Sequence, residues 1–227
     1  MRKATILSMA FGVALLVTQP SHAVMMKGKL ALSPYGGVVI PVGDMADADP
    51  DNDKAKGAET GFNAGGAAEF FIAGNLAVGG RVNYNRFGVD EMFVNPDPGV
   101  SYDLNQTVID FGAYLKWLFA TGGETHPYVR AGAMIGKQKL SGDATAKGEI
   151  ADIKATVDNA LGIEGAIGVL HMFSEQVGGF IEGQITHLMT DDKDVELEFG
   201  GDTDTEKVQG DAQWITIRAG LTIFVGK

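Results

Sequence analysis

The sequence predicts an all-β fold, an eight-stranded antiparallel up-and-down barrel that crosses a membrane. Segments of alternating residues recur along the chain, and each has one apolar face and one polar or small face. The connections between them alternate between short and long, which is typical of outer-membrane barrels. After the N-terminus no apolar run reaches the roughly 20 residues of a membrane-spanning helix, so we expect strands to make the crossing.

The N-terminal segment has the pattern of a secretory signal peptide. Two basic residues precede an apolar run from Ala4 to Val17, and small residues close the segment at Ala23. The run is shorter than the roughly 20 residues that a membrane anchor needs. We expect cleavage after Ala23, which makes residues 1–23 the signal peptide and residues 24–227 the barrel domain.

Composition narrows the class of protein further. The chain has no cysteine, so no disulfide framework holds this exported protein together. Its formal net charge is −11, which disfavours nucleic acid as a partner because binding to phosphate groups requires cations.

Eight strands are expected in chain order, at residues 30–42, 61–72, 76–87, 105–119, 127–138, 157–171, 177–188 and 212–225. Short turns are expected at residues 73–75, 120–126 and 173–176. Long connections rich in Asp and Gly are expected at residues 43–60, 88–104, 139–156 and 189–211. The short turns define the periplasmic rim, and the long connections define the extracellular side.

The first strand is expected at residues 30–42. Each of the others is assigned from residues at every second position. The apolar faces of the other seven run, in order, from Phe62 to Ile72, Leu76 to Tyr84, Ile109 to Trp117, Val129 to Ile135, Leu161 to Val169, Ile181 to Ile185 and Ile215 to Val225. The charges on the opposite faces are, in the same order, Glu69, Arg81, Asp110 with Lys116, Arg130, Glu164, Glu182 and Arg218.

A soluble barrel would show the same alternation with the two faces inverted. Here the polar faces consist mostly of Gly, Ala and Asn around few charges, whereas a water-facing exterior would be crowded with Lys and Glu. Aromatic residues of the apolar face lie near strand ends, with Phe62 and Tyr84 toward the long connections and Phe70, Trp117 and Phe119 toward the short turns. We therefore expect the apolar face to contact outer-membrane lipids and lipopolysaccharide, and the polar face to fill the lumen.

The segment from Ser33 to Asp44, followed by seven further strands, resembles the small outer-membrane β-barrel proteins of the OmpA, OmpX and opacity-protein type. The segment from Arg218 to Val225 resembles the signal by which the barrel insertion machinery recognises such proteins. The chain departs from the usual pattern because Lys227, and not an aromatic residue, ends it. The resemblance implies a monomer in the bacterial outer membrane.

The lumen charges comprise four acids and four bases, which predicts a network of ion pairs, because an unpaired charge in a low-dielectric interior is costly. Two interpretations remain open. The network is either a static plug, or a gated path that makes the protein a narrow, porin-like channel for ions or small solutes.

The acidic connections offer a weak candidate for a divalent-cation site. It consists of Asp47, Asp49, Asp51 and Asp53. Their spacing resembles the start of a calcium loop, but Asn52 and Ala58 stand where that loop needs Gly and Glu. We expect no cofactor beyond loosely bound Ca²⁺, which would bridge these carboxylates to anionic lipid head groups.

Catalysis receives little support from the sequence. The histidines after the signal peptide are His126, His171 and His187, and none lies near a Ser in a nucleophile arrangement. Long loops on a rigid frame usually carry function. By analogy at the level of the fold, we expect a non-enzymatic protein for envelope structure, adhesion or surface contact, with any surface or host ligand bound by the loops.

Overall fold

The computed structural model describes residues 26–49, 52, 54–90, 100–119, 123–146, 149–199, 202–207 and 209–226. The predicted signal peptide lies outside these residues. Among the described residues no helix is long and apolar enough to cross a membrane.

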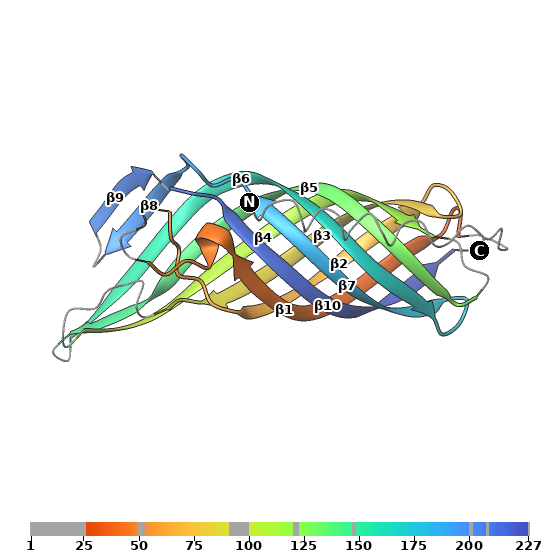
Figure 1. Ribbon diagram of the computed structural model, residues 1–227, viewed down its shortest axis with the longest axis horizontal. Helices are drawn as coiled ribbons and strands as arrows, with labels where there is room; N and C mark the ends of the chain where they lie inside the picture. Colours follow the sequence, from red (N-terminus) through yellow and green to blue (C-terminus); the bar gives the residue numbers. More distant parts are fainter. Residues whose placement is uncertain are drawn as a thin grey trace, which may run out of the picture.

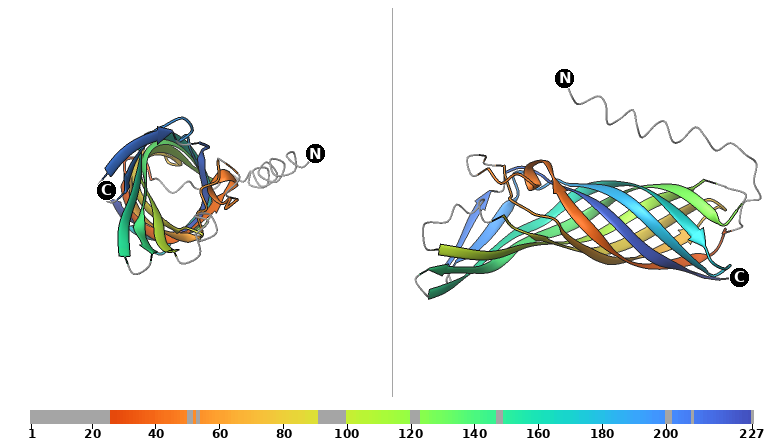
Figure 2. Two further views of the ribbon diagram at one scale, coloured as in Figure 1. Left: turned by 90° about the vertical axis from the view of Figure 1, so that its left-hand side faces the viewer. Right: turned by 60° about the horizontal axis from the view of Figure 1, so that its bottom comes forward.

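Eight strands form a closed antiparallel barrel, which confirms the predicted fold class (Figure 2). They are β1 (Leu30–Val42), β2 (Gly61–Phe71), β3 (Leu76–Gly88), β4 (Val100–Leu118), β5 (Thr125–Ala146), β6 (Glu149–Met172), β7 (Val177–Leu188) and β10 (Ala212–Val225). Each strand pairs with its neighbour in the chain, except that β7 pairs with β10, and β1 pairs with β10 to close the ring.

Three of the long connections predicted as loops are partly strand, which corrects the prediction. Within residues 88–104, β4 already begins at Val100 and pairs there with β5. Within residues 139–156, β5 and β6 continue as a paired hairpin to Ala146 and from Glu149. Within residues 189–211, β8 (Asp194–Phe199) and β9 (Asp202–Lys207) form a second hairpin, and β8 pairs with β6. Neighbouring strands supply hydrogen-bond partners for these polar segments, so their Asp and Gly content does not prevent strand formation.

These hairpins make an extracellular sheet that projects beyond the barrel at the end opposite the short turns (Figure 1). Strand β6 changes its pairing partner along its length. It pairs with β7 from Gly162 toward the periplasmic rim and with β8 from Val157 outward. A register shift between Gly136 and Gln138 in β5 marks the same level of the barrel.

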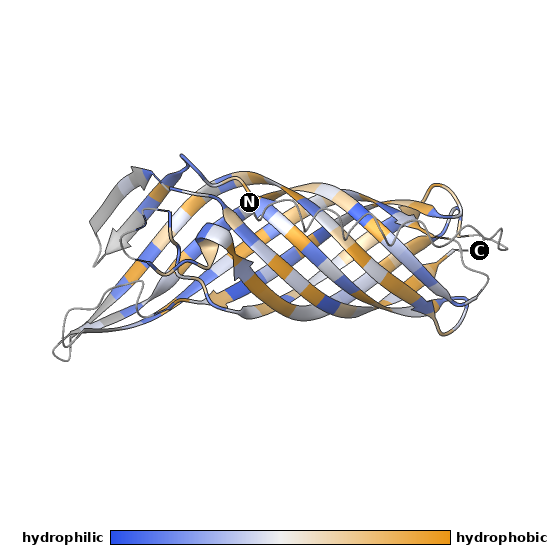
Figure 3. Cartoon of the chain, viewed as in Figure 1, coloured by the Kyte–Doolittle hydropathy of each residue, from blue (hydrophilic) through white to orange (hydrophobic). Residues whose placement is uncertain are grey.

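The barrel wall alternates along every strand between apolar outward and buried inward residues (Figure 3). Outward side chains are well exposed, for example Phe111 at 64% and Ile181 at 66%. On the extracellular side the rings of Phe62 and Tyr84 lie 5.8 Å apart between centroids. This exterior suits contact with lipid tails and interfaces.

Two apolar clusters fill the two ends of the lumen. The periplasmic cluster includes Phe71, Leu118, Tyr128, Leu170 and Phe224. The extracellular cluster includes Val39, Met45, Phe87, Leu188 and Trp214. Met45 belongs to the short 3₁₀ helix η1 (Gly43–Met45) that follows β1, and it is fully buried. The connection after β1 therefore folds inward and packs against the extracellular cluster.

Candidate functional site

The structure places all eight sequence-predicted charges inside the barrel, between the two apolar clusters. Their exposures lie between 0% and 6%. They come from seven strands, because each occupies an inward position of the alternating pattern.

Six of these charges form one connected network. Arg81 pairs with both Asp110 and Glu164. Arg130 continues the chain, with Nη1 3.5 Å from Glu164 Oε1 and Nη2 2.9 Å from Glu182 Oε1. Acids and bases therefore alternate across the lumen.

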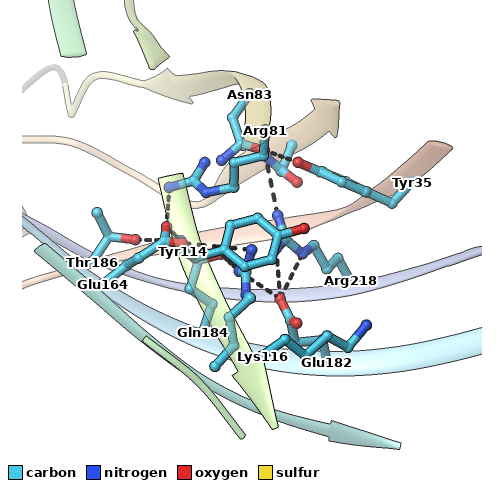
Figure 4. A network of polar contacts seen from close by, with 12 residues as sticks. Tyr35, Arg81, Asn83, Tyr114, Lys116, Glu164, Glu182, Gln184, Thr186 and Arg218 are labelled. Carbon is cyan, nitrogen blue, oxygen red and sulfur yellow. Dashed lines mark hydrogen bonds and ion pairs between the residues drawn. The ribbon is translucent and has the colours of Figure 1, made fainter. Parts of the chain in front are cut away.

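Arg218 and Asn83 close the network into a ring (Figure 4). Arg218 donates from Nε to Glu182 Oε1 at 2.9 Å and from Nη2 to the same oxygen at 2.5 Å. Its Nη1 donates to Asn83 Oδ1 at 3.3 Å, and Asn83 Nδ2 donates to Asp110 Oδ1 at 3.2 Å. The ring ties β3, β4, β5, β6, β7 and β10 together through side chains.

The remaining two charges form a separate pair closer to the periplasmic end. Lys116 Nζ donates to both carboxylate oxygens of Glu69 at 3.1 Å. The Tyr114 hydroxyl donates to Glu69 Oε1 at 2.8 Å. The Glu69 carboxylate therefore has a cationic partner and a hydroxyl donor, and neither belongs to the ring.

Sequence reasoning missed the tyrosines that hold these cations. Arg218 lies 4.1 Å from the ring centroid of Tyr35, Arg130 lies 4.5 Å from that of Tyr114, and Lys116 lies 4.2 Å from that of Tyr128. Each contact is a cation–π interaction, which is stronger where water is excluded. Their inward positions in the alternating pattern are the signal that could have identified them.

The charged layer leaves little free space. A cavity lined by Glu69, Lys116, Arg130, Glu182 and Arg218 among others has a volume of about 10 Å³. That is room for about one water molecule. Within the described residues, apolar clusters occupy the lumen on both sides of the layer, which disfavours a continuous aqueous path.

On the extracellular side, Lys56 joins the connection after β1 to the connection between β7 and β10. Its Nζ donates to the carbonyl oxygen of Gln209 at 3.2 Å. Burial lowers the pKa of Lys56, and the carboxylates of Asp211, Asp44 and Asp191 oppose that shift. This lysine therefore neutralises part of the local acidic charge and fixes the two connections against each other.

Part of the candidate divalent-cation site is engaged in hydrogen bonds within its own loop. Asp47 accepts hydrogen bonds from the Asp49 amide at 3.0 Å and from Asn52 Nδ2 at 2.7 Å. These bonds lower the pKa of Asp47, the amide bond contributing most. Asp51 and Asp53 lie outside the described residues, and loosely bound Ca²⁺ stays a prediction. Within the described part of the chain no three His, Cys, Asp or Glu side chains are grouped to hold a metal ion.

The projecting sheet places three carboxylates side by side. Asp103 of β4 pairs with Asp143 of β5, which pairs with Asp152 of β6. A hydrogen bond with Asp152 is the main cause that raises the pKa of Asp143, and the neighbouring negative charges add to it. The three carboxylates thus form an acidic row across the projecting sheet.

The three histidines do not form a cluster: His126 and His171 lie at adjacent positions of β5 and β6 but on opposite faces of the barrel wall, and His187 lies at the other end of the barrel. His126 is buried at the periplasmic end of the lumen, whereas His171 Nδ1 contacts Thr125 Oγ1 at 2.9 Å on the exposed rim. His187 Nε2 lies 3.1 Å from Asp211 Oδ2 at the extracellular end. The hydrogen bonds of the described residues join none of them to a serine.

A closed antiparallel barrel with an apolar exterior and a charged, filled lumen defines a membrane-spanning protein of bacterial outer membranes. The chain belongs to the outer membrane protein beta-barrel domain family, whose model matches residues 7–221.

Solved structures with this fold include Neisserial surface protein A, with 16% sequence identity, 87% of this chain and 97% of that chain covered, and a TM-score of 0.50. A major outer membrane protein from Thermus thermophilus has 12% identity, with 86% and 99% covered and a TM-score of 0.53. The comparison with curated proteins finds no match.

Proposed function

We propose that this protein is a non-enzymatic surface-contact protein, in which a sealed barrel holds an acidic extracellular sheet away from the membrane. The observation that supports this most directly is the projecting sheet. The paired extensions of β4, β5 and β6, together with β8 and β9, exceed what closure of the barrel requires. A rigid, raised sheet suits contact with a matrix, a host surface or a neighbouring envelope component.

The charge of the sheet indicates which surfaces it would meet. Asp103, Asp143 and Asp152 lie in one cross-strand row, and Asp194 and Glu196 are exposed on β8. Complementary positive potential speeds encounter and improves specificity. We infer a preference for basic surfaces.

The test shortens the sheet without disturbing the barrel. Residues 141–154 are replaced by Asn-Gly, because Leu140 and Ala155 already pair across β5 and β6 and a two-residue turn can join them. A second variant replaces residues 191–209 by a short glycine–serine connection. Heat-modifiable gel migration checks that each barrel still folds.

A third variant of unchanged length separates the effect of the sheet's shape on adhesion from the effect of its charge. It keeps the whole sheet and substitutes Asn for Asp103, Asp143 and Asp152. We expect adhesion of expressing cells to a basic matrix to fall in both shortened variants and in the Asn control. If cells with both segments shortened adhere like wild type, the surface-contact function is wrong.

A narrow channel remains the alternative, since the eight lumen charges lie where a permeation path would run. The apolar clusters on either side of the charged layer disfavour it. Conductance in planar bilayers distinguishes the two functions.

A further inference from the structure

Three cations lie together on the outer face of one wall of the barrel, at its extracellular end. They are Arg86 of β3 and Lys137 and Lys139 of β5, and all three are exposed. Strand pairing places Arg86 and Lys139 in one row with Thr107 of β4, which lies between them. Neighbouring strands are about 4.8 Å apart, so the two cations can converge on a ligand above Thr107. We call these four residues the outer-wall patch.

The patch lies at the level of the membrane interface. On β3 the outward residue before Arg86 is Tyr84. Arg86 also pairs with Phe62, whose ring lies 5.8 Å from that of Tyr84. On β5 the outward residue before Lys137 is the lipid-facing Ile135. Because aromatic rings of this kind mark the head-group level of a bilayer, the cations stand among the head groups of the outer leaflet.

The charge of the patch is concentrated on one wall. On β6 and β10 the first outward residue beyond the apolar run is neutral, namely Asn159 and Gln213. On β7 it is His187, which lies 3.1 Å from the carboxylate of Asp211. General contact with lipid head groups would not favour one wall over another. The concentration of cations on β3 and β5 therefore indicates a discrete site.

The described part of the chain does not neutralise these cations. Arg86 Nε donates to Asn105 Oδ1 at 3.3 Å, which orients the guanidinium without balancing its charge. Lys137 and Lys139 make no ion pair or side-chain hydrogen bond with another described residue. On β5 the acidic row begins only at Asp143, about 13 Å from Lys139 along the strand. In a chain with a net charge of −11, three such cations in one place indicate an anionic ligand.

The donors of the patch suit a phosphate group. A guanidinium donates two parallel hydrogen bonds to phosphate oxygens, and an ammonium adds a compact charge. The Thr107 hydroxyl offers a neutral donor between them. A second copy of the chain is a poor occupant, because copies with the same orientation in one membrane would bring cations to the same height and cation would face cation.

We propose that Arg86, Thr107 and Lys139 bind one phosphate group of a lipopolysaccharide molecule in the outer leaflet, and that Lys137 adds positive charge on the membrane side of it. Arg86 and Lys139 hold the phosphate from two sides, and Thr107 donates to it from below. The site is on the barrel wall and not on the projecting sheet, so the proposal does not depend on the surface-contact function.

The experiment measures binding of lipid A, with both of its phosphates, to the folded protein in detergent by native mass spectrometry. The site variant is Arg86→Gln with Lys139→Gln. The matched control is Lys54→Gln with Lys193→Gln, which removes two exposed lysines from the connections after β1 and after β7. Heat-modifiable migration confirms that both variants fold.

We expect the wild type and the control to bind lipid A equally, and the site variant to bind it about tenfold more weakly, because charged donors to the phosphate are lost. Thr107→Val removes only the hydroxyl and should weaken binding by about threefold. Lys137→Gln with Lys139→Gln should weaken it as well, and this variant tests the patch if the one at Arg86 does not fold. Fully dephosphorylated lipid A should bind the wild type and the site variant equally weakly.

Three outcomes would overturn the proposal. Equal binding of lipid A by the site variant and the control would show that the patch is not the site. Dephosphorylated lipid A that binds the wild type as tightly as lipid A would leave only apolar contact. Inorganic phosphate that displaces lipid A at an equal concentration would make free phosphate, and not the lipid, the ligand.

Discussion

Glu182 joins several residues of the charged layer to one another. It accepts hydrogen bonds from Arg218, from Arg130 and from the Tyr128 hydroxyl, the last at 2.9 Å. A buried carboxylate is stable in a low-dielectric site when several charged donors replace its hydrogen bonds to water. Loss of one donor therefore affects the others.

Removal of Arg218 tests this coupling. Arg218→Ala leaves Glu182 with one cation and takes away the partner of Tyr35, so we expect the free energy of unfolding to fall by about 3–5 kcal/mol. Urea unfolding in phospholipid vesicles measures it. The control is Arg86→Ala, an exposed residue that donates to Asn105, with an expected change below about 0.5 kcal/mol. Equal effects of the two substitutions would contradict the network.

Two adjacent glycines of β3 distinguish lumen packing from the exterior. Gly79 faces inward, and an added Cβ would lie 2.7 Å from Tyr114 Cζ, so Gly79→Ala must displace a tyrosine that donates to Glu69. We expect a loss of about 1–3 kcal/mol in urea unfolding. Gly80→Ala faces outward and should change stability by less than about 0.5 kcal/mol. If the two substitutions change stability by the same amount, displacement of Tyr114 is not the cause of the loss at Gly79.

At the scale of elements, the hairpin of β5 and β6 depends on pH at its tip. Like charges directly opposite each other destabilise a strand pair. The pKa of Asp143 is raised by its hydrogen bond with Asp152, so this contact stabilises the folded tip at acidic pH. The stabilisation is complete below the ordinary aspartate pKa and is lost as the pH rises through the raised pKa.

Hydrogen exchange of the tip amides measures this effect. After correction for intrinsic rates, we expect more protection at acidic than at neutral pH, and Asp143→Asn should give the higher protection at neutral pH. Asp194→Asn is the control, because Asp194 pairs with Lys207 at 2.7 Å on β8 and β9. Protection that does not change with pH, or that changes equally in the control, would remove Asp143 as the cause.

The elements also show how far sequence reasoning reaches. The bounds of β1, β7 and β10 agree with the prediction, because alternation over a half-buried face fixes both the strand and its orientation. The extensions of β5 and β6 were missed, because pairing far above the membrane is decided by partner strands and not by local composition. The tyrosine contacts were missed because alternation shows that a side chain points inward, but not what it touches.

At the scale of the whole molecule, the lumen consists of three layers. Apolar clusters close both ends, and a charge-balanced layer lies between them. An ion that crossed would have to leave water, pass the periplasmic cluster, displace an existing partner of each charge and pass the extracellular cluster. Each step is unfavourable, because desolvation of an ion costs several kcal/mol.

We therefore expect no steady unitary current from wild-type protein in planar bilayers. Arg218→Ala should stay silent as well, since it opens the charged layer while Phe71, Leu118, Phe87 and Trp214 still close the two ends. A gated network predicts the opposite, because release of Glu182 would open the path. A porin reconstituted in parallel confirms that the bilayers report channels. A selective current from the wild type that Arg218→Ala or Glu164→Gln alters would make the charged layer a permeation path, and the channel would replace surface contact as the function.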